Sequence, residues 1–178
     1  MSETIETAAT PVAEITPDLK KALYELQQIE ELEKKRKKKS GITYYIPNPA
    51  QLRAHQSKCR KIIYSGGNRS GKSVFGATEL VFHVTRKYPD WFPMERRFYG
   101  PIKAIVVCDA NAKIEKVIEP KIKEYLPSLW VKSRRSVGGY LNRLIGHDGS
   151  TIDFLSSEQD DMAFEGADWD LYWGDEPQ

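Results

Sequence analysis

The chain has 178 residues, with 27 Lys and Arg against 25 Asp and Glu, which gives a formal net charge of +2. A hydrophobic fraction of 40% and a charged fraction of 29% are typical of a globular domain and exclude a chain too polar to bury a core. No apolar run approaches the roughly 18 residues that span a bilayer. Residues 1–18 also lack the basic and apolar regions of a secretory signal, so we expect an intracellular protein that is not secreted.

The N-terminal region predicts a tail followed by a helix. Residues 1–16 are rich in Thr, Ala and Glu without apolar periodicity, which indicates a disordered tail. Thr16, Pro17 and Asp18 suit the first positions of a helix. Apolar residues then recur at spacings of three and four, at Leu19, Leu23, Leu26, Ile29 and Leu32. This stripe predicts an amphipathic helical segment over residues 17–43 with a basic end.

The basic end of this segment is the run Lys34–Lys39. Cations suit the negative end of a helix dipole, so the run is consistent with a solvated helix end. It is equally consistent with a patch that contacts DNA phosphates or an acidic partner. The apolar stripe either packs on the body of the protein or meets a partner helix.

Residues 44–178 have the pattern of a compact α/β unit. Short apolar segments predict strands at residues 61–65, 103–108, 140–145, 151–155 and 170–173. Longer periodic segments predict helices over residues 72–88 and 113–126, the second restarted at Pro120. A turn at residues 147–150 predicts a hairpin. Because helices separate the other strands, we expect an α/β fold with a mainly parallel sheet flanked by helices.

A glycine-rich loop between the first predicted strand and its helix fits the P-loop (Walker A) pattern G-x-x-x-x-G-K-[ST] in full. Glycines let backbone N–H groups face phosphate oxygens, and the following helix aims its positive end at the same anion. The sequence therefore predicts a P-loop NTPase domain that binds ATP with Mg²⁺. The residues of the loop are Gly66, Gly67, Asn68, Arg69, Ser70, Gly71, Lys72 and Ser73.

Three side chains of this loop have distinct predicted roles. Lys72 reaches the β- and γ-phosphates, and the Ser73 hydroxyl ligates Mg²⁺. Arg69 either reaches a γ-phosphate in its own or a neighbouring subunit, as a catalytic residue beside Lys72, or only caps the loop.

An acidic pair at the end of the last predicted strand completes the predicted site in the manner of a Walker B motif. Asp175 is expected to hold Mg²⁺, and Glu176 to act as the general base that polarises the attacking water. Adjacent side chains on a strand point to different sides, so one acid can face the metal and the other the water. Asp109 also follows an apolar strand and is the rival metal ligand. The alternative for the pair is two solvated acids without a catalytic role.

These segments together resemble a known family. The P-loop with Asn68-Arg69, the hairpin with Gly149-Ser150, the segment Phe164-Glu165-Gly166 and the segment Trp169–Glu176 look like the ATPase domain of the large terminase subunit of tailed bacteriophages. Upstream, Pro49-Ala50-Gln51 resembles that family's adenine-side Gln motif, with Gln51 at the matching position. Tyr44 or Tyr45 could stack on the base.

The resemblance implies a packaging motor. ATP hydrolysis in a homo-oligomeric ring, docked on the portal protein of a procapsid in the host cytoplasm, would drive double-stranded DNA inside. It also implies a small terminase subunit as a partner, for which the N-terminal helix is a candidate dock. The family usually has a later coupling motif and a nuclease domain. Since the chain stops at Gln178, we expect a fragment or one part of a split gene, with an incomplete ATPase domain and no nuclease activity.

Other functions remain open from the residues alone. A helicase or recombinase-type ATPase that acts on DNA would use the same site. A non-hydrolysing assembly module would bind nucleotide or a partner without turnover. A small-molecule kinase is less favoured, because Arg96-Arg97 and Arg134-Arg135 are its only candidates for a lid-like arginine cluster.

Overall fold

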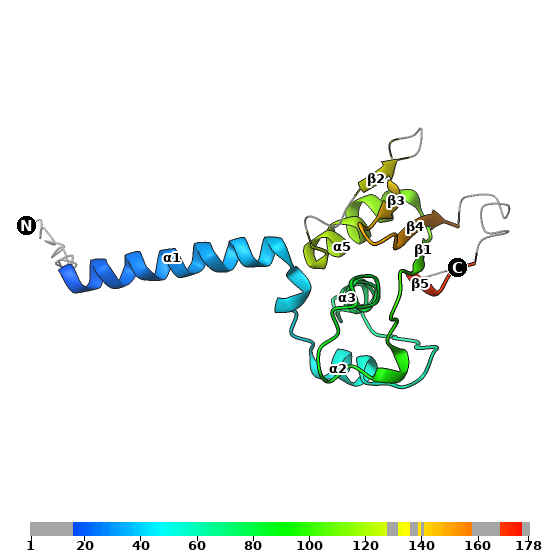
Figure 1. Cartoon of the computed structure of the whole chain (residues 1–178), viewed down its shortest axis with the longest axis horizontal. Coiled ribbons are helices and arrows are strands. Elements are labelled where there is room, and N and C mark those ends of the chain that lie inside the picture. The colour runs from blue at the N-terminus through cyan, green and yellow to red at the C-terminus, as the bar shows by residue number, and fades with distance from the viewer. Residues whose placement is uncertain (1–15, 128–131, 136–138, 140, 158–167, 176–178) are drawn as a thin grey trace, which may run out of the picture. The chain divides into compact units, whose positions relative to one another are not determined.

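The computed structural model describes residues 16–127, 132–135, 139, 141–157 and 168–175, without the side chains of residues 37–39, 132 and 134 (Figure 1). The chain divides into two units, residues 1–35 and residues 36–178. The tail that the sequence predicts to be disordered lies outside the described residues except for Thr16. No helix within the described ranges is long and apolar enough to cross a membrane.

The helix α1 spans Pro17–Lys39. Thr16 precedes it and accepts a hydrogen bond from the Leu19 amide through Oγ1 at 3.4 Å. Its carbonyl oxygen accepts the Lys20 amide at 3.0 Å. These contacts confirm the predicted helix start, because a Thr side chain satisfies an N-terminal amide that has no intrahelical acceptor. The five apolar residues of the predicted stripe are each between 44% and 55% exposed.

A five-stranded sheet organises the second unit, in the order β2-β3-β4-β1-β5 (Figure 1). β1 is parallel to β4 and β5, whereas β3 is antiparallel to β2 and β4. The sheet is therefore mixed: β1, β4 and β5 form the predicted parallel part, and the predicted hairpin of β3 and β4 extends it, together with β2, by an antiparallel part. The tight turn before β4 forces an antiparallel pair, and the sequence pattern did not indicate β2. The strands are β1 (Lys103–Cys108), β2 (Lys132–Arg135), β3 (Leu141–Ile145), β4 (Thr151–Ser156) and β5 (Leu171–Asp175).

The prediction of a strand at residues 61–65 is wrong. This segment pairs with no strand of the described sheet, and Ile63 is 95% exposed. Tyr64 and the edge strand β5 instead line a common cavity of about 660 Å³. An extended apolar segment becomes a strand only where a neighbouring backbone offers N–H and C=O partners. Here the segment and β5 face the cavity rather than each other's backbone.

The helices agree better with the sequence. α3 spans Lys72–Thr85 and ends where Arg86 takes the left-handed conformation, at φ 56°. The helix expected over residues 113–126 consists of α4 (Asn111–Lys113), the π-helical segment η3 (Ile114–Ile118) and α5 (Glu119–Tyr125). Pro120 has no N–H and crowds the carbonyl four residues earlier, and the wider π turn relieves this conflict. The shorter elements are η1 (Gly41–Tyr44), α2 (Pro49–His55) and η2 (Met94–Arg96).

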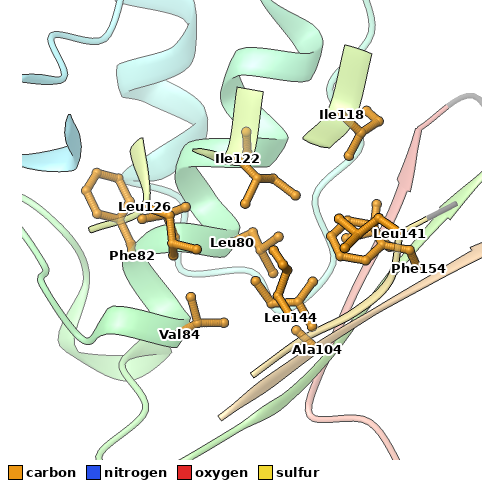
Figure 2. Packing of buried hydrophobic residues seen from close by; sticks show 14 of the residues in the cluster. Leu80, Phe82, Val84, Ala104, Ile118, Ile122, Leu126, Leu141, Leu144 and Phe154 are labelled. Carbon is orange, nitrogen blue, oxygen red and sulfur yellow. The ribbon is translucent and has the colours of Figure 1, made fainter. Parts of the chain in front are cut away.

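The hydrophobic core lies between one face of the sheet and the helices α3 and α5 (Figure 2). Leu80 and Val84 of α3 and Ile122 of α5 gather there with Leu144 and Phe154 of the strands. Along β1 the alternate residues Ala104, Val106 and Cys108 belong to this core, as expected for side chains that alternate between the faces of a sheet. This packing fixes α3, and with it the P-loop at its N-terminus, against the sheet.

Candidate nucleotide and metal site

The P-loop leads directly into α3. Gly71 precedes the helix with φ 86°, a left-handed conformation that glycine adopts without strain. The first intrahelical bond runs from the Phe75 amide to the Gly71 carbonyl at 2.9 Å. The amides of the preceding turn therefore have no acceptor within the helix, and together with the helix dipole they favour an anion at this end.

The loop closes on its own lysine. Lys72 Nζ donates to the carbonyl oxygens of Gly66 at 2.7 Å and Gly67 at 3.2 Å. Arg69 lies at the exposed tip in the left-handed region, at φ 63°, which is uncommon outside glycine. Ser70 Oγ is buried, and no described atom forms a hydrogen bond with it. The loop thus has a strained tip and an unsatisfied buried hydroxyl, and both are common at ligand-binding loops.

The decisive contact in the site joins the P-loop helix to the acidic strand. Ser73 Oγ donates to Asp175 Oδ1 at 3.4 Å, across 102 residues of sequence. β5 pairs in parallel with β1, in the register Cys108 with Asp175, which fixes where Asp175 emerges from the sheet. Asp175 is only 6% exposed. The structure therefore brings together the hydroxyl and the carboxylate that the sequence assigned to one metal.

The oxygen atoms of Ser73 and Asp175 are suitable ligands for a hard divalent cation. Mg²⁺ prefers oxygen ligands and takes only one or two from the protein when substrate phosphates supply others. No group of three or more His, Cys, Asp or Glu side chains that could hold a metal occurs among the described residues. Ser73 contacts Asp175, whereas Oδ1 of the rival Asp109 accepts from the Ala110 amide at 3.0 Å and lies 3.5 Å from Lys113 Nζ. The two oxygens of Ser73 and Asp175 thus fit a Mg²⁺ that arrives with a triphosphate.

A model of a known protein family matches this chain. The family described as "Terminase large subunit, T4likevirus-type, N-terminal" matches residues 63–178, which is more than half of the chain. The chain belongs to this family. No match was found among the curated proteins or among the solved structures. Membership in the large terminase family supports a role in the packaging of viral DNA.

In this terminase chain, Gln51 lies against the P-loop. It closes a capping box at the start of α2, where its Oε1 accepts the Asn48 amide at 2.9 Å. Its Nε2 donates to the Gly71 carbonyl at 3.0 Å. Gln51 is 4% exposed. Gln51, the expected adenine-side residue, is therefore a buried side chain that links α2 to the P-loop by hydrogen bonds.

The two tyrosines considered for base stacking differ in exposure. Tyr45 packs against the hydrophobic core, and its hydroxyl contacts His55 Nε2 at 3.0 Å. Burial raises the pKa of Tyr45 to about 12. Tyr44 is 38% exposed and is the more accessible of the two.

A buried polar cluster behind the P-loop helix was not indicated by the sequence. Glu79 of α3 pairs with Arg96 and with His55 Nδ1, the latter at 2.5 Å. Arg96 also donates to the carbonyls of His55 and Ser57, both at 3.0 Å. Burial lowers the pKa of His55 to about 3, and the neighbouring Arg96 and His83 act in the same direction. These residues come from separate elements, so no spacing in the sequence could have linked them.

Several predicted residues lie outside the part that is described. Glu176, the expected general base, follows the last described residue, and Phe164-Glu165-Gly166 falls within the range 158–167. The arginines considered for a kinase lid have structural partners where their side chains are described. Arg97 donates to the carbonyls of Pro89 and Phe92, and Arg135 pairs with Glu119.

Proposed function

We propose that this chain is the ATPase motor subunit of a phage terminase, which uses ATP and Mg²⁺ to package double-stranded viral DNA into procapsids. The observation that carries the proposal is the approach of Ser73 Oγ to Asp175 Oδ1 at 3.4 Å. A P-loop serine and a strand-end aspartate on one cation are what a P-loop NTPase requires. Family membership supports the packaging role independently.

Each residue of the loop has a proposed task. The backbone of residues 66–71 and the N-terminus of α3 would cradle the phosphates. Lys72 would exchange the Gly66 and Gly67 carbonyls for β- and γ-phosphate oxygens. Arg69, at the exposed tip, would meet the γ-phosphate in its own or a neighbouring subunit.

The metal and the water have proposed partners of their own. Ser73 and Asp175 would hold Mg²⁺, which when bound withdraws charge from the phosphate oxygens. Glu176 is proposed to take the proton of the attacking water. Gln51 is proposed on the adenine side, with one of its amide hydrogens already donated to Gly71.

The proposed partners follow from the family. They are double-stranded DNA, the portal protein and the small terminase subunit, with a homo-oligomeric ring at the procapsid in the host cytoplasm. The exposed stripe of α1 is proposed as the dock for the small subunit or the portal. Removal of residues 1–40 is expected to abolish this binding, and equal binding by the shortened chain would refute the dock.

The test of the proposed function is ATP binding and hydrolysis by the chain with Mg²⁺, beside Lys72→Ala and a matched control. Lys61→Ala is a suitable control, because Lys61 is an exposed lysine outside the loop. Wild type and Lys61→Ala are expected to bind ATP, and Lys72→Ala is expected to lose binding at least about tenfold. Binding that survives Lys72→Ala would contradict the proposal.

Hydrolysis separates the motor from its alternatives. Turnover that portal and double-stranded DNA stimulate supports the packaging motor, whereas stimulation by single strands would favour a helicase. Lys72-dependent binding without turnover under any of these conditions would favour a nucleotide-binding assembly module.

A further inference from the structure

Lys113 contacts both acids that the sequence offered as metal ligands. Its Nζ lies 3.2 Å from Asp175 Oδ2 and 3.5 Å from Asp109 Oδ1. It also donates to the Asp175 carbonyl oxygen at 3.3 Å. The Lys113 side chain is 19% exposed. An ammonium group therefore lies inside the candidate metal site, at a position that belongs to no recognised sequence motif.

The sheet explains why a lysine is needed there. β1 and β5 are parallel neighbours, and Asp109 and Asp175 lie at their carboxyl ends. Their carboxylates repel each other, and an unpaired charge on the buried Asp175 would be costly. The chain turns into α4 directly after β1, and this turn returns Lys113 to the same edge. Its charge offsets both acids.

The two carboxylate oxygens of Asp175 have separate partners. Oδ1 accepts the Ser73 hydroxyl at 3.4 Å, and this pair is the proposed Mg²⁺ ligand set. Oδ2 pairs with Lys113. Lys113 thus holds the carboxylate by one oxygen and leaves the other directed at Ser73.

We propose that Lys113 is a built-in counter-ion in the metal site. Its ammonium group positions Asp175 and weakens the binding of a divalent cation until a triphosphate binds. The inference rests on the proposed function. An ammonium a few ångströms away repels a divalent cation, so the nucleotide-free site binds it weakly. Phosphate charges offset this repulsion, so cation and nucleotide bind together. Lys113 is thus a positioning residue, since it acts through Asp175.

The experiment measures binding of Mn²⁺ alone to the nucleotide-free chain, by the electron paramagnetic resonance signal of free Mn²⁺. Lys113→Met is expected to bind Mn²⁺ at least about tenfold more tightly than wild type, because a repulsive charge is gone. Lys113→Arg keeps the charge and is expected to bind like wild type. Lys116→Met is the matched control, since Lys116 is an exposed lysine three residues further along.

A second variant locates the cation. Asp175→Asn in the Lys113→Met background is expected to remove the gain in Mn²⁺ affinity. Unchanged or weaker Mn²⁺ binding by Lys113→Met would overturn the proposal. An equal gain in Lys116→Met, or a gain that survives Asp175→Asn, would overturn it as well. If Lys113→Met does not fold, judged by circular dichroism, Lys113→Gln removes the charge with a polar side chain and is held to the same criteria.

ATP binding, measured separately, tests the proposed function. Lys72-dependent ATP binding by the wild-type chain, followed by a negative Mn²⁺ result, would defeat the Lys113 inference alone. Absence of ATP binding in wild type would defeat the proposed function, whatever the Mn²⁺ titration gives.

Discussion

Trp173 of β5 occupies the space that a side chain at position 76 of α3 would need. A Cβ added to Gly76 would lie 2.2 Å from Trp173 Cε2, well inside contact distance. Gly76 therefore lets the P-loop helix approach the strand that ends in Asp175. The close approach of Ser73 and Asp175 depends on this packing, because Ser73 lies on α3 with Gly76 and Asp175 lies on β5 with Trp173.

Gly76→Ala is expected to destabilise the protein. The added methyl group must push α3 away from β5, and overpacking of this kind costs about 1–3 kcal/mol. Urea unfolding measures the loss. Gly100→Ala is the control, since a Cβ at Gly100 meets nothing within 4 Å. Trp173→Phe in the Gly76→Ala background is expected to recover part of the loss, and equal midpoints for wild type and Gly76→Ala would contradict the packing.

Gln51→Ala is expected to weaken binding of tripolyphosphate as well as ATP. The side chain holds the Gly71 carbonyl at 3.0 Å, so its loss frees the loop whatever base the ligand carries. A loss of about 1 kcal/mol, near fivefold in affinity, is typical of one hydrogen bond. An adenine contact would add a further loss for ATP only. If tripolyphosphate affinity stays at the wild-type value, the hydrogen bond from Gln51 to Gly71 has no influence on the loop.

Glu79→Gln is expected to be among the most destabilising single changes in the chain. It leaves the guanidinium of Arg96, whose side chain is 9% exposed, without its carboxylate. Loss of one partner from a buried pair costs about 3–5 kcal/mol. Chemical denaturation checks this value. The double variant Glu79→Leu with Arg96→Met removes both charges and is expected to be more stable than Glu79→Gln, and the reverse order would refute the pairing.

Acid is expected to destabilise the fold in part through His83. Burial lowers the pKa of His83 to about 4, whereas an unfolded histidine titrates near 6.5. The unfolded state therefore binds more protons below pH 6.5, and the histidine's contribution is lost as pH falls from about 6.5 through about 4. The limiting slope is about 1.4 kcal/mol per pH unit.

The check is urea denaturation at pH 7.5 and pH 5.0. His83→Asn is expected to lose about 1–2 kcal/mol less stability than wild type between these values. His147→Asn, at an exposed position of the hairpin turn, serves as control. An identical pH dependence in wild type and His83→Asn would rule out a titrating role for His83.

The sequence predicted local features well. Of the long-range geometry it predicted the meeting of Ser73 and Asp175, but not the residues that surround this pair. The P-loop, the start of α1 and the restart at Pro120 depend on residues close in sequence, and their physical causes are local. The prediction of a strand at residues 61–65 was wrong because a strand requires a neighbouring backbone to pair with, and the composition of a segment does not reveal one. The contacts of Lys113 and of the Glu79 cluster could not be predicted for the same reason. The register of β1 with β5 brings the partners of Lys113 together, and the packing of α3 brings those of Glu79 together.

The most direct test of the central claim is a double-mutant cycle on Ser73→Ala and Asp175→Asn, read as the gain in ATP affinity that Mg²⁺ provides. If both residues serve one cation, either variant removes most of this gain and the second adds little. The expected coupling is about 1 kcal/mol or more. Losses that add independently would mean that Ser73 and Asp175 act on different sites, in contradiction to a single nucleotide and metal site at the start of α3.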